Sequence, residues 1–262
     1  MAENKKEVLN SSMYGWCGKI LKVDLSSDVI TEIDTQPYAD RFLGGRGIAT
    51  RLYWENVPAT GNAFAPENYL IFMTGPLTAT GAQGASRFSI IGKSPMLMPE
   101  GFCYGNMGGY WGASLKRAGF DGLMVSGKAE RPVYLFISDG NVTIKDASRI
   151  HLEGVKQVEE YLHQTYGKKT HFITTGPAGM NLCRNANLMT DNEGSATGGF
   201  GAVLGAKNLK AIAVIGTQSP QVSDPVALKE LNQFTIKLNK RDTSFNPYPP
   251  DQISRKGKAS CF

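Results

Sequence analysis

Apolar and polar residues alternate in two parts of the chain, and this alternation predicts two β-hairpins. The first covers Gly18–Asp34 around a Ser-Ser-Asp turn, and the second covers Pro132–Ser148 with Asp139-Gly140 or Gly140-Asn141 as its turn. A period of two is typical of half-buried strands, and such dipeptides favour tight hairpin turns. Shorter apolar runs predict single strands at Leu70–Thr74, Arg87–Ile91, Gly122–Val125, His171–Thr175, Asn185–Met189 and Ala211–Ile215.

Apolar residues three and four positions apart predict the helices. The segment Gly154–Tyr166 has this spacing, and Pro37–Val57 has it on both sides of a break at Gly44–Gly47. Further helices are expected at Gly112–Ala118, Leu204–Leu209 and Ser223–Asn239, the last one capped by Ser223 or Asp224. Because strands and helices do not alternate regularly, the pattern indicates an α+β fold rather than a doubly wound one.

One arrangement of elements occurs twice along the chain. The strand-like runs Ile71–Pro76 and Phe172–Pro177 both end in Thr-Gly-Pro, and Gly108–Gly127 and Gly198–Gly216 both open with Gly-Gly and close with Val-x-Gly. This duplication predicts a two-lobe domain of mixed β-sheets with short helices, with repeats at about 70–127 and 171–216. The domain is expected over 13–218, after a disordered tail at 1–12 and before the start of a truncated helical domain at 219–262.

Glycine is the compositional outlier. The chain has 30 glycines in 262 residues, whereas average usage would give about 18. They cluster in loops, which indicates backbone that takes unusual dihedral angles or approaches another group closely. The net charge of +5 is mild and no basic tract is interleaved with aromatic residues, which argues against a nucleic-acid partner and suits a polyanionic cofactor.

Four widely separated cysteines, without a CxxC pair, argue against a zinc or iron–sulfur site built from this chain alone. The polar first twelve residues lack a signal-peptide core, and no apolar run approaches 18 residues. These features predict a reduced, cytoplasmic protein without a membrane span. The three histidines share no metal-ligand spacing, so they are expected to be structural or exposed.

Two glycine loops are the candidate binding site. Asn106–Gly109 and Gly194–Ala196 each precede a short predicted helix, where free backbone N–H groups can bind a phosphate. Asn106 and Gly194 could also offer oxygens to a bridging cation, and Arg87 presents a planar guanidinium suited to an anion. A structural interpretation stays open, in which Asn106 caps a helix, the glycines permit close packing and Arg87 forms a surface ion pair. Asp191 and Glu193 are expected to be solvated or to orient a neighbouring loop.

At these residues the chain resembles the N-terminal domain of the tungsten-dependent aldehyde:ferredoxin oxidoreductase family. The resemblance extends over about Tyr14–Thr217. Its motifs, in the family's order, are FLGGRG, FAPENYLIFMTGPLTATGA, SRFSIIGKSP, NMGGYWGASLKRAGFDGLMVSGKAERPVYLFI, IKDASRIHLEG, TGPAGMNL and GGFGAVLGAKNLKAIAVIG. The resemblance implies an α+β fold with an internal duplication.

The resemblance also implies a cofactor in which two pterins hold one tungsten, with molybdenum as an alternative, and a magnesium ion bridges the pterin phosphates. Arg87 matches the arginine between pterin and the iron–sulfur cluster, and Asn106 matches the magnesium-bridging asparagine. Gly108 and Gly109 match the pterin-binding glycines. Gly194, Ser195 and Ala196 match the second phosphate loop, where Gly194 would also serve the magnesium.

The chain departs from the family in that second loop, which usually reads like RAAGRGG and here reads EGSATGG. A 4Fe-4S cluster needs four ligands, and the family's cluster cysteines lie in later helical domains, so Cys261 is at most the first of them. The resemblance implies oxidation of a small aldehyde to a carboxylic acid, with ferredoxin or a ferredoxin-like subunit accepting the electrons, and a homo-oligomer is compatible with it. A non-catalytic pterin-binding scaffold subunit and an inactive truncated fragment remain alternatives.

Overall fold

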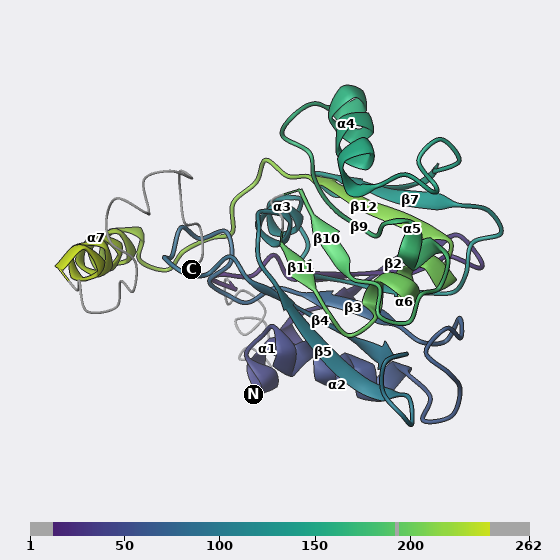
Figure 1. The fold of residues 1–262 in the computed structure, drawn as a ribbon. Helices are drawn as coiled ribbons and strands as arrows, with labels where there is room; N and C mark the ends of the chain where they lie inside the picture. The colour runs from purple at the N-terminus through teal and green to yellow at the C-terminus, as the bar shows by residue number, and fades with distance from the viewer. Residues whose placement is uncertain (1–12, 192–193, 242–262) are drawn as a thin grey trace, which may run out of the picture.

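A computed structural model describes residues 13–191 and 194–241, and these residues fold around two six-stranded sheets (Figure 1). The first sheet has the order β2-β1-β6-β3-β4-β5 and contains β1 (Lys19–Asp24), β2 (Val29–Asp34), β3 (Leu70–Met73), β4 (Phe88–Ser94), β5 (Gly101–Met107) and β6 (Gly122–Ser126). The second sheet has the order β11-β10-β9-β12-β7-β8 and contains β7 (Val133–Ser138), β8 (Asn141–Asp146), β9 (His171–Thr174), β10 (Leu188–Thr190), β11 (Ser195–Ala196) and β12 (Leu209–Ile215). The helices are α1 (Gln36–Phe42), α2 (Arg46–Asn56), α3 (Trp111–Arg117), α4 (Val155–Tyr166), α5 (Pro177–Met180), α6 (Phe200–Ala206) and α7 (Pro225–Arg241).

The two sheets have the same topology. In each sheet a hairpin, β1–β2 or β7–β8, joins the rest through one parallel pairing, β1 with β6 or β7 with β12. In each sheet the next strand, β3 or β9, then pairs antiparallel. This confirms the internally duplicated α+β fold. We call 19–126 the first lobe and 133–215 the second lobe; each contains a hairpin that the ranges 70–127 and 171–216 left out, because the hairpins lack the glycine motif.

The main hydrophobic core lies between the two sheets and includes α3 and α6. Trp111 of α3 is fully buried, and its indole Nε1 donates a 2.9 Å hydrogen bond to the carbonyl oxygen of Ile212 in the other lobe. Its ring also packs against Phe72 and Phe88 of its own sheet. The Trp111 side chain thus contacts both sheets. Its only polar side-chain atom, Nε1, has a hydrogen-bond partner, which a buried tryptophan usually needs.

Helices cover the two outer faces of this pair of sheets (Figure 1). On the first sheet, α2 packs its buried residues Ile48, Ala49 and Leu52 in a separate apolar cluster. On the second sheet, α4 does the same through Val158 and Leu162. The sheets are therefore buried on both faces over much of their area, which explains why several predicted strands are continuous apolar runs rather than alternating ones.

Helix α7 lies beside the two sheets rather than between them (Figure 1). The carboxylate of Asp224 accepts a 2.9 Å hydrogen bond from the N–H of Ala227, which confirms Asp224 as its N-terminal cap. The amide of Asn232 ties the helix to the body through Gly81 and Gln83. No helix in the described ranges combines the length and the apolar character needed to cross a membrane. The predicted tail at 1–12 and the segment after 241 lie outside the described residues.

The sequence patterns missed or misplaced four elements. Only one strand was expected between Gly75 and Gly112, yet the structure has a second strand there, β5. The sequence did not reveal it because β5 is an edge strand whose outward-facing residues, Phe102 and Tyr104, are apolar and so weaken the alternation of apolar and polar positions. Helix α6 begins at Phe200 rather than Leu204, directly after the left-handed Gly199. Short elements gave no signal of their own, so α5 and β11 were not predicted.

Lys207 joins the two lobes through its buried ammonium group. Its Nζ, from the second lobe, donates to the carbonyl oxygens of Pro66 and Gly127, at 3.2 and 3.3 Å. Burial lowers the pKa of Lys207 to about 7, and the carboxylates of Glu67 and Asp24 only partly offset this. A charged lysine here is therefore costly at neutral pH although two of its three N–H donors have partners.

We expect this lysine to give stability a specific pH dependence. An unfolded lysine titrates near 10.4, so the unfolded chain binds more protons than the folded chain between pH about 7 and 10. The free energy of unfolding should therefore rise with pH in that window, by up to about 1.4 kcal/mol per pH unit. The rise in the free energy of unfolding should be smaller in Lys207→Met, which has no titrating group at this position. The two carbonyl oxygens lose their donor in this variant, but that loss is the same at every pH. Urea unfolding at pH 7, 8 and 9 measures it.

The matched control for this prediction is Lys128→Met. It removes an exposed lysine that follows Gly127, one of the two residues whose carbonyl oxygen Lys207 binds. Its stability should follow the wild-type pH dependence. Parallel curves for wild type and Lys207→Met would contradict the assignment of a low pKa to Lys207.

A second prediction concerns the packing of α5 against α6. A Cβ on Gly205 would overlap the carbonyl oxygen of Gly179, whereas a Cβ on Gly176 would meet no atom within 4 Å. Gly205→Ala should lower the free energy of unfolding by about 1–3 kcal/mol, as overpacking of cores does. Gly176→Ala, measured by the same denaturant titration, should change it far less; equal losses would show that space at Gly205 is not limiting.

Candidate functional site

The first glycine loop follows strand β5 and is bound by the arginine that precedes β4. The β4–β5 register pairs Phe88 with Met107, which brings Arg87 beside the start of the loop. The guanidinium Nη2 of Arg87 donates a 2.9 Å hydrogen bond to the carbonyl oxygen of Asn106, and a Cβ on Gly108 would lie 3.6 Å from Nη1. Arg87 and Asn106 are both exposed. Within the described residues, which leave out Glu193, Arg87 bonds the backbone of the loop and forms no ion pair.

Asn106 does not cap helix α3, so that interpretation was wrong. It lies inside β5, opposite Ser89, and the N-cap of α3 is Tyr110, without a side-chain capping bond. The intervening Gly109 has a φ of +95°, a value that favours glycine. Its backbone turns the chain from the strand into the helix, which leaves the side chain of Asn106 exposed on the face of the sheet.

The second glycine loop joins β10 to β11. The carbonyl oxygen of Gly194 accepts a 2.8 Å hydrogen bond from the N–H of Thr190, and its N–H donates to the Thr190 hydroxyl at 3.1 Å. Ser195 is exposed, whereas Ala196 is buried and pairs with Leu188. The loop therefore offers Gly194 and Ser195 to a ligand, while Ala196 faces the core.

The two loops meet although they are more than 80 positions apart in sequence. A Cβ on Gly194 would lie 2.9 Å from the carbonyl oxygen of Gly108, so the two backbones are in contact. Behind them, the edge strands β5 and β11 are neighbours, and a Cβ on Gly105 would lie 3.2 Å from the Cβ of Ala196. Packing of the two sheets at this edge brings Gly108 and Gly194 together, with Arg87 and Asn106 beside Gly108.

A histidine–carboxylate pair that the sequence did not predict lies beside the loops. The Nδ1 of His171, at the start of β9, is 2.6 Å from Oδ2 of Asp191, which follows β10. The ring of Tyr110, next to Gly109, lies 5.4 Å from the His171 ring. The Asp191 side chain is only 6% exposed, so it is not solvated as one interpretation of the sequence expected, and it pairs with His171 on the neighbouring strand. Twenty positions separate the pair, so local patterns carried no signal for it.

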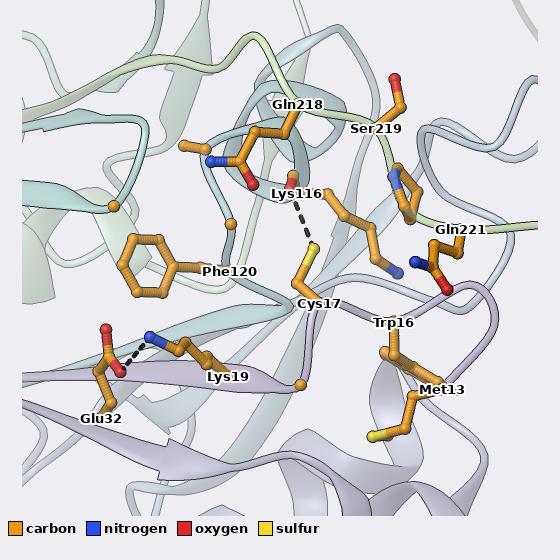
Figure 2. A pocket seen from close by; sticks show the side chains of 15 residues that line it. Met13, Trp16, Cys17, Lys19, Glu32, Lys116, Phe120, Gln218, Ser219 and Gln221 are labelled. Atoms are coloured by element: carbon orange, nitrogen blue, oxygen red, sulfur yellow. Dashed lines mark hydrogen bonds and ion pairs between the residues drawn. The ribbon is translucent and has the colours of Figure 1, made fainter. Parts of the chain in front are cut away.

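A separate cavity of about 550 Å³ lies at the other end of α3, next to residues that follow the helix (Figure 2). The thiol of Cys17 donates to the carbonyl oxygen of Lys116 at 3.1 Å, and burial raises the pKa of Cys17 to about 12. The thiol is therefore neutral at physiological pH and a poor nucleophile. Lys116 is itself bonded to the carbonyl oxygen of Gly75 and lies 3.5 Å from buried Asp121. These contacts hold the fold together at a distance from the glycine loops.

Some residues near the predicted sites cannot be placed. Cys261, the predicted cluster ligand, lies outside the described residues, and so do Asn192 and Glu193, which precede Gly194 in the second loop. Within 13–191 and 194–241, no three or more histidine, cysteine or acidic side chains are grouped so as to hold a metal ion. In that part of the chain, any bridging cation would have to be held by backbone or amide oxygens, such as those of Asn106 and Gly194.

The comparisons with known proteins agree with this geometry. Residues 20–216 match the family model described as the aldehyde ferredoxin oxidoreductase N-terminal domain. A tungsten-containing aldehyde ferredoxin oxidoreductase from Pyrococcus horikoshii is 41% identical over 88% of this chain and 38% of its own length. The WOR-like subunit of an aliphatic sulfonate oxidoreductase from Pyrococcus furiosus is 34% identical over 84% of this chain and 38% of its own.

A solved structure has the same fold. The active-site complex BamBC of benzoyl coenzyme A reductase, in complex with 1,5-dienoyl-CoA, superposes with a TM-score of 0.83 at 31% identity, covering 90% of this chain and 37% of that one. The chain thus spans somewhat more than a third of the length of the relatives it matches. By its sequence, its duplicated sheets and its paired glycine loops, the chain belongs to the aldehyde ferredoxin oxidoreductase family and contains that family's N-terminal domain.

Proposed function

We propose that this chain binds the phosphate side of a tungsten-bis-pterin cofactor, with molybdenum as an alternative metal, in an enzyme that oxidises a small aldehyde to its carboxylic acid. The observation that carries the proposal is the contact between the two glycine loops, one from each lobe. A duplicated domain with two such loops suits a ligand that itself has two similar halves. Relatives named as tungsten-containing aldehyde ferredoxin oxidoreductases support the same assignment.

The residues present fit such a cofactor. Gly194 lacks a Cβ where one would run into the carbonyl oxygen of Gly108, so the two loop backbones can approach closely. Arg87 uses one nitrogen on Asn106, and a guanidinium has five N–H donors, so it can also bind an anion. The carbonyl oxygen of Asn106 accepts from Arg87, and that of Gly194 accepts from the N–H of Thr190 at 2.8 Å and from the Thr190 hydroxyl at 3.4 Å; backbone oxygens of this kind are ligands that magnesium takes.

The role of these residues is to bind and orient rather than to react. The loops would fix the two phosphates, Arg87 would balance their negative charge, and the rigid sheet edges would keep the spacing constant. When bound, the tungsten cofactor supplies the two-electron redox chemistry in which aldehyde and water become carboxylic acid, two protons and two electrons. We propose ferredoxin, or a ferredoxin-like subunit reached through a 4Fe-4S cluster, as the electron acceptor, and Cys261 as one cluster ligand.

A second candidate function is reduction of an aromatic acyl thioester. The observation that favours it is the superposition with the BamBC complex of benzoyl coenzyme A reductase. The same loops would bind the same kind of cofactor, so the reactions differ in the substrate and in the direction of electron flow. A scaffold subunit that holds the pterin without its own redox chain is compatible with the name of the WOR-like subunit relative.

Metal and pterin analysis of the purified 262-residue chain tests the proposal. We expect tungsten or molybdenum and pterin in a ratio near one metal to two pterins. Activity is measured in addition with a redox dye as the electron carrier. Oxidation of an aldehyde would favour the first function, and reduction of an aromatic acyl thioester would favour the second candidate. Pterin without either activity would favour the scaffold subunit. A folded chain that contains neither metal nor pterin, even after expression with tungstate, would contradict the proposal.

Gly194→Ala should separate the two loops and remove the cofactor. The new Cβ would lie 2.8 Å from the Thr190 hydroxyl and 2.9 Å from the carbonyl oxygen of Gly108, distances too short for real Cβ contacts. We expect pterin content, measured by fluorescence after oxidation, to fall at least tenfold. Gly101→Ala, on the same β5 strand but 3.9 Å from its nearest neighbour, is the matched control and should retain pterin. Equal pterin in both variants would show that the loop contact is not needed.

A further inference from the structure

His171 is held by a buried carboxylate and keeps one side of its ring towards solvent. The His171 side chain is 24% exposed and the Asp191 side chain only 6% exposed, with 2.6 Å between Nδ1 and Oδ2. The other oxygen, Oδ1 of Asp191, is buried and has no hydrogen-bond partner in the described part of the chain. A buried carboxylate with one unpartnered oxygen is costly unless a cation lies against it, and His171 is the group in that position.

The same histidine is connected to both glycine loops through Asp191 and Tyr110. Asp191 is three residues before Gly194, whose backbone contacts Gly108, and Tyr110 follows Gly109 and packs on the His171 ring at 5.4 Å. Among the described residues, none forms a hydrogen bond with Nε2 of His171, the nitrogen on the side of the ring away from Asp191. Nε2 of His171 is therefore a further polar group near the loops, where Arg87, Ser195 and backbone N–H groups are the other donors.

We propose that His171 binds a phosphoryl group between the two loops, with Asp191 as a positioning residue that fixes the orientation of the ring. This rests on the proposed function, since the phosphoryl group is assigned to the pterin cofactor. The imidazolium donates from Nε2 to a phosphate oxygen while Nδ1 donates to Asp191, so both nitrogens are donors, as they are in charged histidine. A hydrogen bond between charged partners is about twice as strong as a neutral one.

The arrangement also explains why the second loop needs no cationic side chain among its described residues. Asp191, Gly194, Ser195 and Ala196 offer only one charge, and it is negative. His171 comes from the neighbouring strand β9, which pairs with β10, and it reaches the same place from the side. Arg87 serves the first loop in the same manner, from strand β4 next to β5. Each loop thus has one cation, supplied by an adjacent strand.

Calorimetric titration of the full 262-residue chain with inorganic pyrophosphate and Mg²⁺ tests the assignment. We expect His171→Gln, which keeps a donor but loses the charge, to weaken pyrophosphate binding about tenfold. His171→Lys restores the charge and should bind within about threefold of wild type. The matched control is His163→Gln, because His163 is also near a carboxylate, Glu159 at 3.9 Å, but lies on α4. Unchanged binding in His171→Gln would overturn the proposal.

Nitrogen NMR of the imidazoles distinguishes direct contact from a merely structural effect. Pyrophosphate should shift the Nε2 resonance of His171 and leave that of His163 in place. In Asp191→Asn the shift should be reduced while the thermal midpoint stays within a few degrees of wild type. A His171 resonance that ignores pyrophosphate would overturn the assignment even if affinity had changed.

Coenzyme A is the second probe, because a phosphoryl group could also belong to a thioester substrate. His171-dependent binding of pyrophosphate but not of coenzyme A supports the cofactor assignment, and the reverse overturns it. The outcomes also separate this inference from the proposed function. A chain that contains pterin yet binds pyrophosphate independently of His171 would refute only the role of His171. A His171-dependent pyrophosphate site in a chain that never acquires pterin would refute only the proposed cofactor.

Discussion

The close approach of two glycine backbones, Gly108 and Gly194, is the contact on which the candidate site depends. It is possible only because Gly194 has no Cβ, since a single methyl group there would lie 2.9 Å from the opposite carbonyl oxygen. The contact joins the end of β5 in the first lobe to the turn after β10 in the second lobe. Without it, the loops would belong to two separate sheet edges and could not share one ligand.

The interior of the molecule keeps these edges together. Helices α3 and α6 lie in the core between the sheets, and Trp111 donates its indole hydrogen to the opposite lobe. Lys207 crosses between the lobes in the other direction and bonds two carbonyl oxygens of the first lobe. Burial of apolar surface supplies the bulk of the stabilisation, while these polar contacts specify how one lobe sits on the other. The spacing of the loops is thus a property of the whole core.

The two lobes share a topology but differ in their functional side chains. The first loop is accompanied by Arg87 and the exposed Asn106, and the second by the His171–Asp191 pair. A duplicated backbone can therefore present two similar glycine loops whose neighbouring polar side chains come from different positions. Such an arrangement keeps the geometry of a symmetric ligand while allowing each side of the site to be tuned separately. The cavity beside Cys17 and Lys116 is remote from these loops, and its polar groups bond the protein itself.

The sequence by itself determined the fold class, the duplication, most strands and helices, and the two loops that carry the candidate site. Period-two and helical spacings are local, and the glycine motifs are repeated, so a single chain reveals them. It missed β5 because an edge strand with outward aromatics lacks clean alternation, and it did not show that each repeat includes a hairpin. Only the tertiary structure decided that Gly108 touches Gly194, that Asn106 lies in a strand rather than capping a helix, and that His171 pairs with Asp191. The physical reason is that these contacts join segments from different strands or lobes, and their partners are chosen by how the two sheets pack.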